Sequence, residues 1–306
     1  MSRPQEADFH HLTGDNGLCL ATMGTFVDAK PERDITEPDL QFLKSLKPHL
    51  SVSELKAHVL ESFARGMNTG GVKYRCFQSL YHLLPAITDH YLYTSLVSRS
   101  QKGLFLDLGG GQGTDARKLI QDGWPAQHIT ISDVETFLWN VGLDLYEDGP
   151  KGPVQFIKAN ILDAADINSG GPLHNFLGAT DVVYAQAVLH LFNKETVKAY
   201  ATTAKALVKP GGLFIGANCT SDPPGAFGKR EDSSGAPWLY TPAGFKAVLE
   251  EAGYVDVRIE TSPFDDFIRR RGFGPTHWDV DISKLFGDSK RQLIWATWSA
   301  TRPTSS

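Results

Sequence analysis

The chain has 306 residues, of which 41% are hydrophobic and 21% charged, a composition ordinary for a folded globular protein. The formal net charge is -5, whereas nucleic-acid-binding proteins usually carry an excess of basic residues, so we expect no nucleic-acid partner. No apolar run approaches the roughly 18 residues of a membrane span, and the polar N-terminus lacks the apolar core of a secretion signal. Three scattered cysteines without a Cys-x-x-Cys pair predict neither a disulfide framework nor a zinc site. We therefore expect a cytoplasmic protein without a membrane partner.

The first hundred residues carry helix signals and no strand alternation. Thr36 followed by Glu37-Pro38-Asp39 is a typical helix start, because threonine caps, proline suits the first turn and acids favour the positive end of the helix dipole. Leucines at helical spacing follow. Residues 53–66 and 74–85 predict two further helices. The expected organisation is an N-terminal helical cap or lid over residues 1–100, followed by a core over residues 101–306.

From Gly103 onward, strands alternate with helices, a rhythm that predicts parallel strand pairing. Helices are expected over residues 115–120, 194–207 and 241–253. The expected strands cover residues 104–108, 129–133, 154–161, 181–187, 213–218, 255–260 and 292–301. The fold class is therefore predicted to be α/β, with a doubly wound, Rossmann-like sheet of seven strands.

The first expected strand runs directly into a glycine turn. Asp107 is followed by glycines at 109, 111 and 113, which suit a sharp turn that a ligand approaches closely. Thr114 stands where a dinucleotide fingerprint needs Gly or Ala, and no Lys-Ser/Thr follows as in a P-loop. An acid two residues before the first glycine suits a cationic ligand better than a pyrophosphate. S-adenosylmethionine (SAM), with its ammonium and sulfonium groups, fits this pattern.

Polar residues also end the next two expected strands. Asp133 lies 20 residues beyond Gly113, where a carboxylate meets ribose hydroxyls in a doubly wound nucleotide site. A helix N-cap is the alternative role for this residue. Asn160 lies at the carboxyl end of the following strand.

These motifs together resemble the class I SAM-dependent methyltransferases of small molecules over about residues 103–302. The glycine motif, Asp133, the segment 156–162 and the turn Lys209-Pro-Gly-Gly212 occur in the order of that family. The resemblance implies a SAM cofactor, S-adenosylhomocysteine as its product, and a small-molecule acceptor. The cofactor contacts that it implies are Asp107, Gly109, Gly111, Gly113, Asp133, Val134, Asn160, Ile161, Gln186 and Ala187.

Two finer similarities narrow the family. Residues 181–192 look like the fourth-strand region of O-methyltransferases, in which a histidine serves as general base; this implies a catalytic His190. Residues 132–148 and Tyr74-Arg75-Cys76 are similar to fungal meroterpenoid and secondary-metabolite methyltransferases of the austinol, andrastin and terretonin type. Those relatives form methyl esters or ethers on polyketide–terpenoid intermediates.

The sequence also departs from that pattern. The family usually carries Asp where this chain has Asn160, although an amide oxygen can still accept a hydrogen bond from an adenine amino group. The region around Trp238 lacks the His-Ser segment of the meroterpenoid group. These departures leave the acceptor and the choice between ester and ether open.

Candidate acceptor contacts are spread along the chain. For His190, a histidine that merely packs at a helix start is the alternative. For the other candidates, ordinary packing or solvation is the alternative, and the run Arg269-Arg270-Arg271 is expected to be a solvated face. No acid cluster has metal-ligand spacing, so no metal cofactor is expected. The candidate substrate-binding residues are Tyr74, Arg75, Trp238, His277 and Trp278.

The expected function is a SAM-dependent O-methyltransferase that methylates a carboxyl or hydroxyl group of a secondary metabolite. The alternative is a cyclase or pericyclase of the same fold that uses the cofactor as a fixed charge and transfers no methyl group. The glycine spacing argues against an NAD-dependent oxidoreductase, and a non-catalytic SAM sensor is a further alternative. Whether the protein forms a homodimer stays open.

Overall fold

The computed structural model describes residues 31, 33–68, 75–226, 236–271 and 291–304. Its centre is a seven-stranded sheet in the order β3-β2-β1-β4-β5-β9-β8. The first five strands are parallel, and β9 runs antiparallel to both of its neighbours. The strands are β1 Phe105–Leu108, β2 Ile129–Asp133, β3 Gln155–Lys158, β4 Thr180–Gln186, β5 Val208–Asp222, β8 Val255–Pro263 and β9 Gln292–Thr301. This order confirms the predicted doubly wound α/β fold, with its switch point between β1 and β4.

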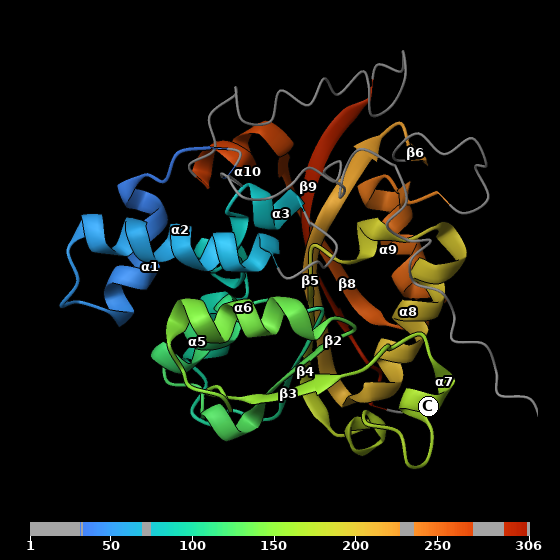
Figure 1. The fold of residues 1–306 in the computed structure, drawn as a ribbon. Coiled ribbons are helices and arrows are strands. Elements are labelled where there is room, and N and C mark those ends of the chain that lie inside the picture. The colour runs from blue at the N-terminus through green and yellow to red at the C-terminus, as the bar shows by residue number, and fades with distance from the viewer. Residues whose placement is uncertain (1–30, 32, 69–74, 227–235, 272–290, 305–306) are drawn as a thin grey trace, which may run out of the picture.

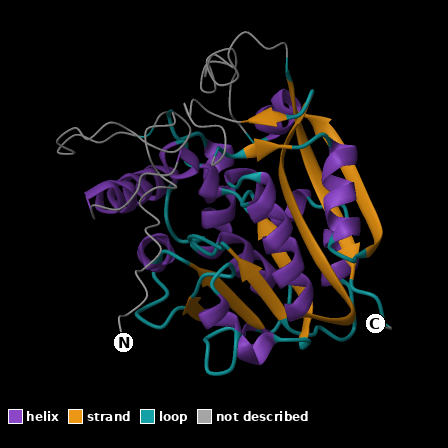
Figure 2. Ribbon diagram, turned by 90° about the vertical axis from the view of Figure 1, so that its right-hand side faces the viewer, coloured by secondary structure: helices purple, strands orange, loops and turns teal. Residues whose placement is uncertain are grey.

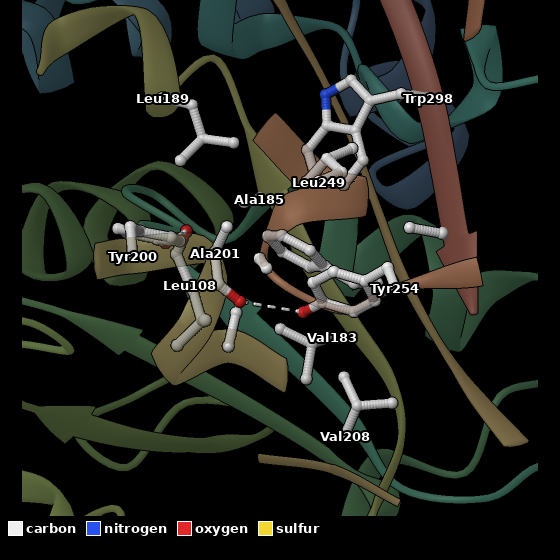
Figure 3. Close-up of a cluster of buried hydrophobic side chains, with 14 of the residues drawn as sticks. Leu108, Val183, Ala185, Leu189, Tyr200, Ala201, Val208, Leu249, Tyr254 and Trp298 are labelled. Carbon is white, nitrogen blue, oxygen red and sulfur yellow. Dashed lines mark hydrogen bonds between the residues drawn. The ribbon is translucent and has the colours of Figure 1, made fainter. Parts of the chain in front are cut away.

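Helices cover both faces of this sheet (Figures 1 and 2). On one face, α8 and α9 pack against β4, β5 and β9, and a buried cluster fills the layer between them (Figure 3). On the other face, α4, α5 and α6 pack against β1, β2 and β4. The helices are α1 Glu37–Leu46, α2 Val52–Asn68, α3 Arg75–Gln78, α4 Tyr93–Val97, α5 Thr114–Gln121, α6 Thr136–Tyr146, α7 Ala164–Ile167, α8 Lys194–Leu207, α9 Pro242–Glu251 and α10 Phe264–Arg270.

Helix α8 illustrates how local sequence fixes these elements. Asn193 precedes the helix, and its Oδ1 accepts a hydrogen bond from the backbone N–H of Thr196 at 2.9 Å. Buried residues then recur at helical spacing, at 197, 200, 201, 204 and 207. They meet Val183 and Phe214 from the sheet. The helix bounds agree with those predicted from the sequence.

The N-terminal helices pack onto the core through α6. The apolar faces of α1 and α2 form one buried cluster with Leu138, Val141 and Leu145 of that helix. Arg33 forms a buried ion pair with Asp39, the third residue of α1, and Asp39 also accepts the backbone N–H of Thr36 at 2.7 Å. The division into a cap over residues 1–100 and a core over 101–306 stays a prediction.

Two expected elements differ from the prediction. The helix expected over residues 74–85 is broken: α3 is followed by Leu80 in a left-handed conformation with φ of 60° and by a 3₁₀ turn, Tyr81–Leu83. Strand β5 extends well beyond the predicted residues 213–218, because antiparallel pairing with β9 continues to Asp222. No helix in the part of the chain described above combines the length and apolar character needed to cross a membrane.

Candidate functional site

The glycine turn connects β1 to α5 at the switch point of the sheet. Gly109 has φ of 84°, and its N–H donates to the carbonyl of Ser132 on β2 at 2.7 Å. Gly113 has φ of 71° and caps α5; a Cβ at this position would lie 2.7 Å from the Trp139 ring. Glycine is therefore required at Gly113 both for its backbone conformation and for space.

Asp133 joins the turn to the end of β2. One carboxylate oxygen accepts the N–H of Gly111 at 3.1 Å, and the other accepts the N–H of Glu135 at 3.0 Å. Burial raises the pKa of Asp133, while these two hydrogen bonds oppose the shift. The carboxylate thus lies at the carboxyl end of the strand beside the turn, in the position predicted from its register.

Buried polar atoms without a protein partner surround this turn in the described chain. They are Oδ1 of Asp107, Nε2 of Gln112 and Oγ of Ser132. Asp107 is 2% exposed; its burial, together with the nearby carboxylates of Asp115 and Asp133, raises its pKa well above the usual range. A buried acid and a buried amide donor without partners fit a ligand that carries both a cation and hydrogen-bond acceptors. SAM meets both requirements.

The end of β3 supplies the next predicted contact. Oδ1 of Asn160 accepts the N–H of Leu162 at 3.0 Å, and the N–H of Asn160 donates to Asp166 at 2.6 Å. An amide oxygen has a second lone pair, so Asn160 can still accept one more hydrogen bond. Ile161 is buried next to it, and Val134 follows Asp133 at the end of β2.

The end of β4 holds Gln186 and Ala187. Ala187 has φ of 56°, and its N–H donates to the carbonyl of Ala217 on β5 at 2.8 Å. The amide of Gln186 contacts the hydroxyl of Tyr81 through Nε2 at 3.1 Å and that of Tyr184 through Oε1 at 3.0 Å. Sequence reasoning missed Tyr81, because a broken helix brings it to this strand end.

His190 lies in a 3₁₀ turn, Leu189–Leu191, just after β4. Its Nδ1 is 3.3 Å from the backbone nitrogen of Cys219 on β5. A backbone N–H can only donate, so Nδ1 is the acceptor and the neutral ring carries its hydrogen on Nε2. Burial lowers the pKa of His190 to about 4, so the ring is neutral at physiological pH.

Of the five predicted substrate contacts, Trp238 is the one with a described side chain. It lies in β7, Trp238–Leu239, which pairs with β6, Gly225–Ala226. The backbone N–H of Trp238 donates to the carbonyl of Phe192 at 2.9 Å. Nζ of Lys194 lies 3.8 Å from the centroid of the Trp238 ring. Trp238 is therefore next to the segment that carries His190. Tyr74, His277 and Trp278 lie outside the described residues, and Arg75 is placed only as the start of α3.

An aromatic group lies over the extended ends of β5 and β9. Phe267 of α10 stacks on Trp295 of β9, with 3.9 Å between ring centroids, and Tyr81 lies 6.1 Å from Phe267. These rings pack in one buried cluster with Ala187 and Cys219. The backbone of Cys219 also contacts His190, so this aromatic group adjoins the candidate acceptor site.

Arg271, which follows α10, corrects one expectation. It is 4% exposed and donates to the carbonyl of Pro85 at 3.0 Å and to Asp89 at 3.1 Å. Its guanidinium carbon also lies 4.5 Å from the ring centroid of Tyr81. The prediction of a solvated face over residues 269–271 is therefore wrong for Arg271, because the end of α10 turns it toward the carbonyls of the Tyr81–Pro85 segment.

Among the described residues, no group of three His, Cys, Asp or Glu side chains is arranged to hold a metal.

No protein-family model matches the chain. The O-methyltransferase atr3 of Stereocaulon alpinum is 30% identical over 225 residues, which cover 70% of this chain and 61% of that protein. The methyltransferase adrK of Penicillium rubens is 32% identical over 145 residues, or 46% of this chain and 51% of that protein. The methyltransferase ausD of Penicillium brasilianum is 27% identical over 190 residues, or 61% of this chain and 66% of that protein.

The chain is a relative of fungal secondary-metabolite methyltransferases. This confirms the resemblance expected from the sequence. The matches span between 51% and 66% of the length of these relatives.

Solved methyltransferase structures are also similar to this chain. The 1,6-didemethyltoxoflavin-N1-methyltransferase of Burkholderia thailandensis, solved with S-adenosylhomocysteine, is 17% identical with a TM-score of 0.49, covering 83% of this chain and 92% of that one. The phosphoethanolamine N-methyltransferase 2 of Haemonchus contortus, solved with SAM, is 13% identical with a TM-score of 0.49. This match covers 88% of this chain and 60% of that one. The fold class of this chain rests on its own strand order and register.

Proposed function

We propose that this protein is a SAM-dependent O-methyltransferase whose cofactor lies across the glycine turn. The observation that carries the proposal is the group of unpartnered buried polar atoms around that turn, with Asp107 at its centre. They lie at a switch point, where doubly wound sheets bind nucleotides. The fungal relatives, all named methyltransferases, support the same activity.

When bound, SAM supplies an electrophilic methyl group on a sulfonium. Asp133 would accept hydrogen bonds from the ribose hydroxyls, and the amide oxygen of Asn160 would accept one from the adenine amino group. Asp107 would offset the positive charge of the ligand. Gln186 and Ala187, at the end of β4, would lie on the acceptor side of the cofactor.

The acceptor group that we propose is a carboxylate. Because Nδ1 of His190 accepts the N–H of Cys219, Nε2 keeps its hydrogen and can only donate. A donor at this position orients a carboxylate through one oxygen and leaves the other free to attack the methyl carbon. A carboxylate is already ionised and needs no base, whereas a phenol or alcohol needs one within reach. Under this proposal His190 is a donor to the acceptor, in place of the general base that the family resemblance implies.

Isothermal titration calorimetry tests the cofactor site. SAM and S-adenosylhomocysteine should bind the wild type, and Asp133→Ala should weaken both by about 1–3 kcal/mol, the cost of leaving buried polar groups unpaired. Asp144→Ala is the matched control, because Asp144 is an exposed acid of α6 that pairs with Arg65. Folded wild-type protein that binds neither ligand would refute the proposal.

The acceptor group is tested with SAM carrying a labelled methyl group. Carboxylic acids of aromatic and terpenoid type, each paired with the matching phenol or alcohol, are offered as acceptors. We expect label in products from the acids, and its release as methanol in mild alkali, which cleaves esters and leaves ethers intact. Products from the hydroxyl compounds alone would overturn the carboxylate proposal. A transformed acceptor without stoichiometric S-adenosylhomocysteine would instead favour the cyclase.

A further inference from the structure

Arg117 of α5 packs directly against the glycine turn. It is 5% exposed, and its Nη1 donates to the carbonyl of Gln112 at 2.6 Å and to that of Gly113 at 2.8 Å. A Cβ at Gly113 would lie 2.8 Å from this same nitrogen. The missing side chain of Gly113 therefore makes room for the guanidinium of Arg117 as well as for the Trp139 ring.

The guanidinium of Arg117 is itself fixed by residues of α6 and the loop after it. Its Nε donates to Oδ2 of Asp148, just after α6, at 2.8 Å, and its Nη2 donates to the same oxygen. The guanidinium carbon lies 4.2 Å from the centroid of the Tyr146 ring and 5.2 Å from that of Trp139. All three guanidinium nitrogens are thus paired, so Arg117 ties the turn to a separate part of the chain.

The contacts of Arg117 fix the two peptide groups on either side of Gly113. In a trans peptide the carbonyl and the next N–H point in opposite directions, so a carbonyl held by Arg117 turns the following N–H away from it. The N–H of Gly113 meets the carbonyl of Gly110 at 2.8 Å, and this bond closes the turn. In the closed turn, the N–H of Gly111 donates to Oδ2 of Asp133 at 3.1 Å.

Gln112 provides a second connection to the proposed cofactor site. It is 7% exposed, and its Nε2 is one of the buried polar atoms without a protein partner around the turn. Because Arg117 holds the carbonyl of this residue, the backbone that carries the unpartnered amide is fixed as well. Arg117 therefore acts on the Gln112 amide and on the Asp133 carboxylate through the backbone of the turn.

We propose that Arg117 is a positioning residue that holds the glycine turn in its cofactor-binding shape before the ligand arrives. Its positive charge is paired with Asp148, so its contribution is to direct two carbonyl groups rather than to attract the ligand. A turn that is already ordered binds more tightly, because less conformational entropy is lost on binding. The effect on cofactor affinity rests on the proposed function. The order of the turn in the ligand-free chain does not.

Hydrogen exchange of the ligand-free protein, followed by mass spectrometry, tests the order of the turn. Arg117→Met removes every donor but keeps an apolar stem between the Trp139 and Tyr146 rings, so the variant should fold. We expect the peptide that covers residues 108–114 to exchange faster in Arg117→Met than in the wild type, while peptides of β5 keep their rate. A folded Arg117→Met protein whose turn exchanges at the wild-type rate would overturn the proposal.

Arg33→Met is the matched control for a general loss of stability. Arg33 is 6% exposed and, like Arg117, donates to two carbonyls and one carboxylate. Its partners are the carbonyls of Asp34 and Ser79 and the carboxylate of Asp39. We expect Arg33→Met to leave the exchange of residues 108–114 unchanged. Equal acceleration in both variants would mean that Arg117 acts only through overall stability, which contradicts a positioning role.

Calorimetric titration with S-adenosylhomocysteine measures the effect on the cofactor. We expect Kd to rise about 10-fold or more in Arg117→Met, and to rise less in Arg117→Lys, whose ammonium can still reach one of the two carbonyls. In Arg33→Met it should stay within about twofold of the wild type. An unchanged Kd in Arg117→Met would overturn the positioning role. A wild type that binds no ligand would instead refute the proposed function, and the exchange experiment would still decide whether Arg117 orders the turn.

Discussion

The backbone N–H of Cys219 donates to Nδ1 of His190, with 3.3 Å between the two nitrogens. This contact joins the extended part of β5 to the turn after β4 and leaves Nε2 as the ring nitrogen that carries the hydrogen. Because the pKa of His190 is lowered to about 4, its ring stays neutral throughout the physiological pH range.

The role of His190 is tested with two substitutions. A glutamine side chain can place an amide N–H near the position of Nε2, whereas alanine offers no donor. We expect His190→Ala to lower kcat/KM by about 10- to 100-fold, the loss of a hydrogen bond to a charged group worth ~1.5–3 kcal/mol. His190→Gln should retain most of the activity. A general base would make both variants equally poor.

The pH dependence of the wild type gives a separate check on His190. With a pKa of about 4, the ring does not titrate between pH 6 and 8, so kcat/KM should show no step near the ordinary histidine value. The rate is measured across this range at saturating SAM. A sigmoidal rise centred near pH 6.5 that disappears in His190→Gln would contradict the neutral-donor role.

The glycine turn predicts a difference between two Gly→Ala substitutions. Gly113 and Gly123 both have positive φ, 71° and 87°, but a Cβ at Gly113 meets the Trp139 ring whereas a Cβ at Gly123 meets nothing within 4 Å. Gly123→Ala should cost about 1–2 kcal/mol, the strain of a left-handed residue. Gly113→Ala should cost more and should also weaken SAM binding. Urea unfolding and calorimetry measure the two effects, and equal costs would argue against a tightly packed turn.

Arg271 and Arg269 form a matched pair on the same short segment. Arg271 is buried among carbonyl groups and Asp89, whereas the Arg269 side chain is 70% exposed. Arg271→Met should destabilise the fold by about 1–3 kcal/mol, because it leaves the carbonyl groups of the Tyr81–Pro85 segment without their donor, whereas the Asp89 side chain is 37% exposed and remains in contact with water. Arg269→Met should change the free energy of unfolding by less than about 0.5 kcal/mol. A similar small effect at both positions would place Arg271 in solvent.

The buried ion pair of the N-terminal helices predicts an acid-dependent loss of stability. Burial tends to raise the pKa of Asp39, but hydrogen bonds from Arg33 and Thr36 outweigh it, so the pKa is lowered overall. A carboxyl with a lowered folded-state pKa stabilises the protein above its unfolded-state value near 3.8 and loses that contribution as the pH falls through the folded-state value. The free energy of unfolding should therefore drop in acid, and Asp39→Asn should reduce that drop. Urea titrations from pH 7 to 3 measure it.

Local signals in the sequence were sufficient for most of the core. The alternation of strands and helices, the helix caps and the glycine turn each depend on neighbouring residues, and the bounds of β2, α8 and β9 agree with prediction. The register of Asp133 beside the turn also followed from spacing alone.

Features that depend on distant contacts were not predictable in this way. Tyr81 reaches Gln186 because Leu80 breaks a helix whose apolar pattern continues. Arg271 belongs to a run of three arginines, a pattern typical of an exposed segment. It is buried because its guanidinium donates to carbonyls about 190 residues earlier in the chain, which no local pattern indicates. The tautomer of His190 depends on a backbone N–H of another strand.

Strand β9 lies between β5 and β8, although it is the last of the sheet strands along the chain. Its ten residues supply pairing partners to both neighbours, so β5 and β8 cannot be joined without it. During synthesis, both strands therefore emerge with an open edge that stays open until residue 301 has left the ribosome. The sheet therefore closes only after β9 has been made, and the open edges of β5 and β8 must be kept from pairing with other chains until then.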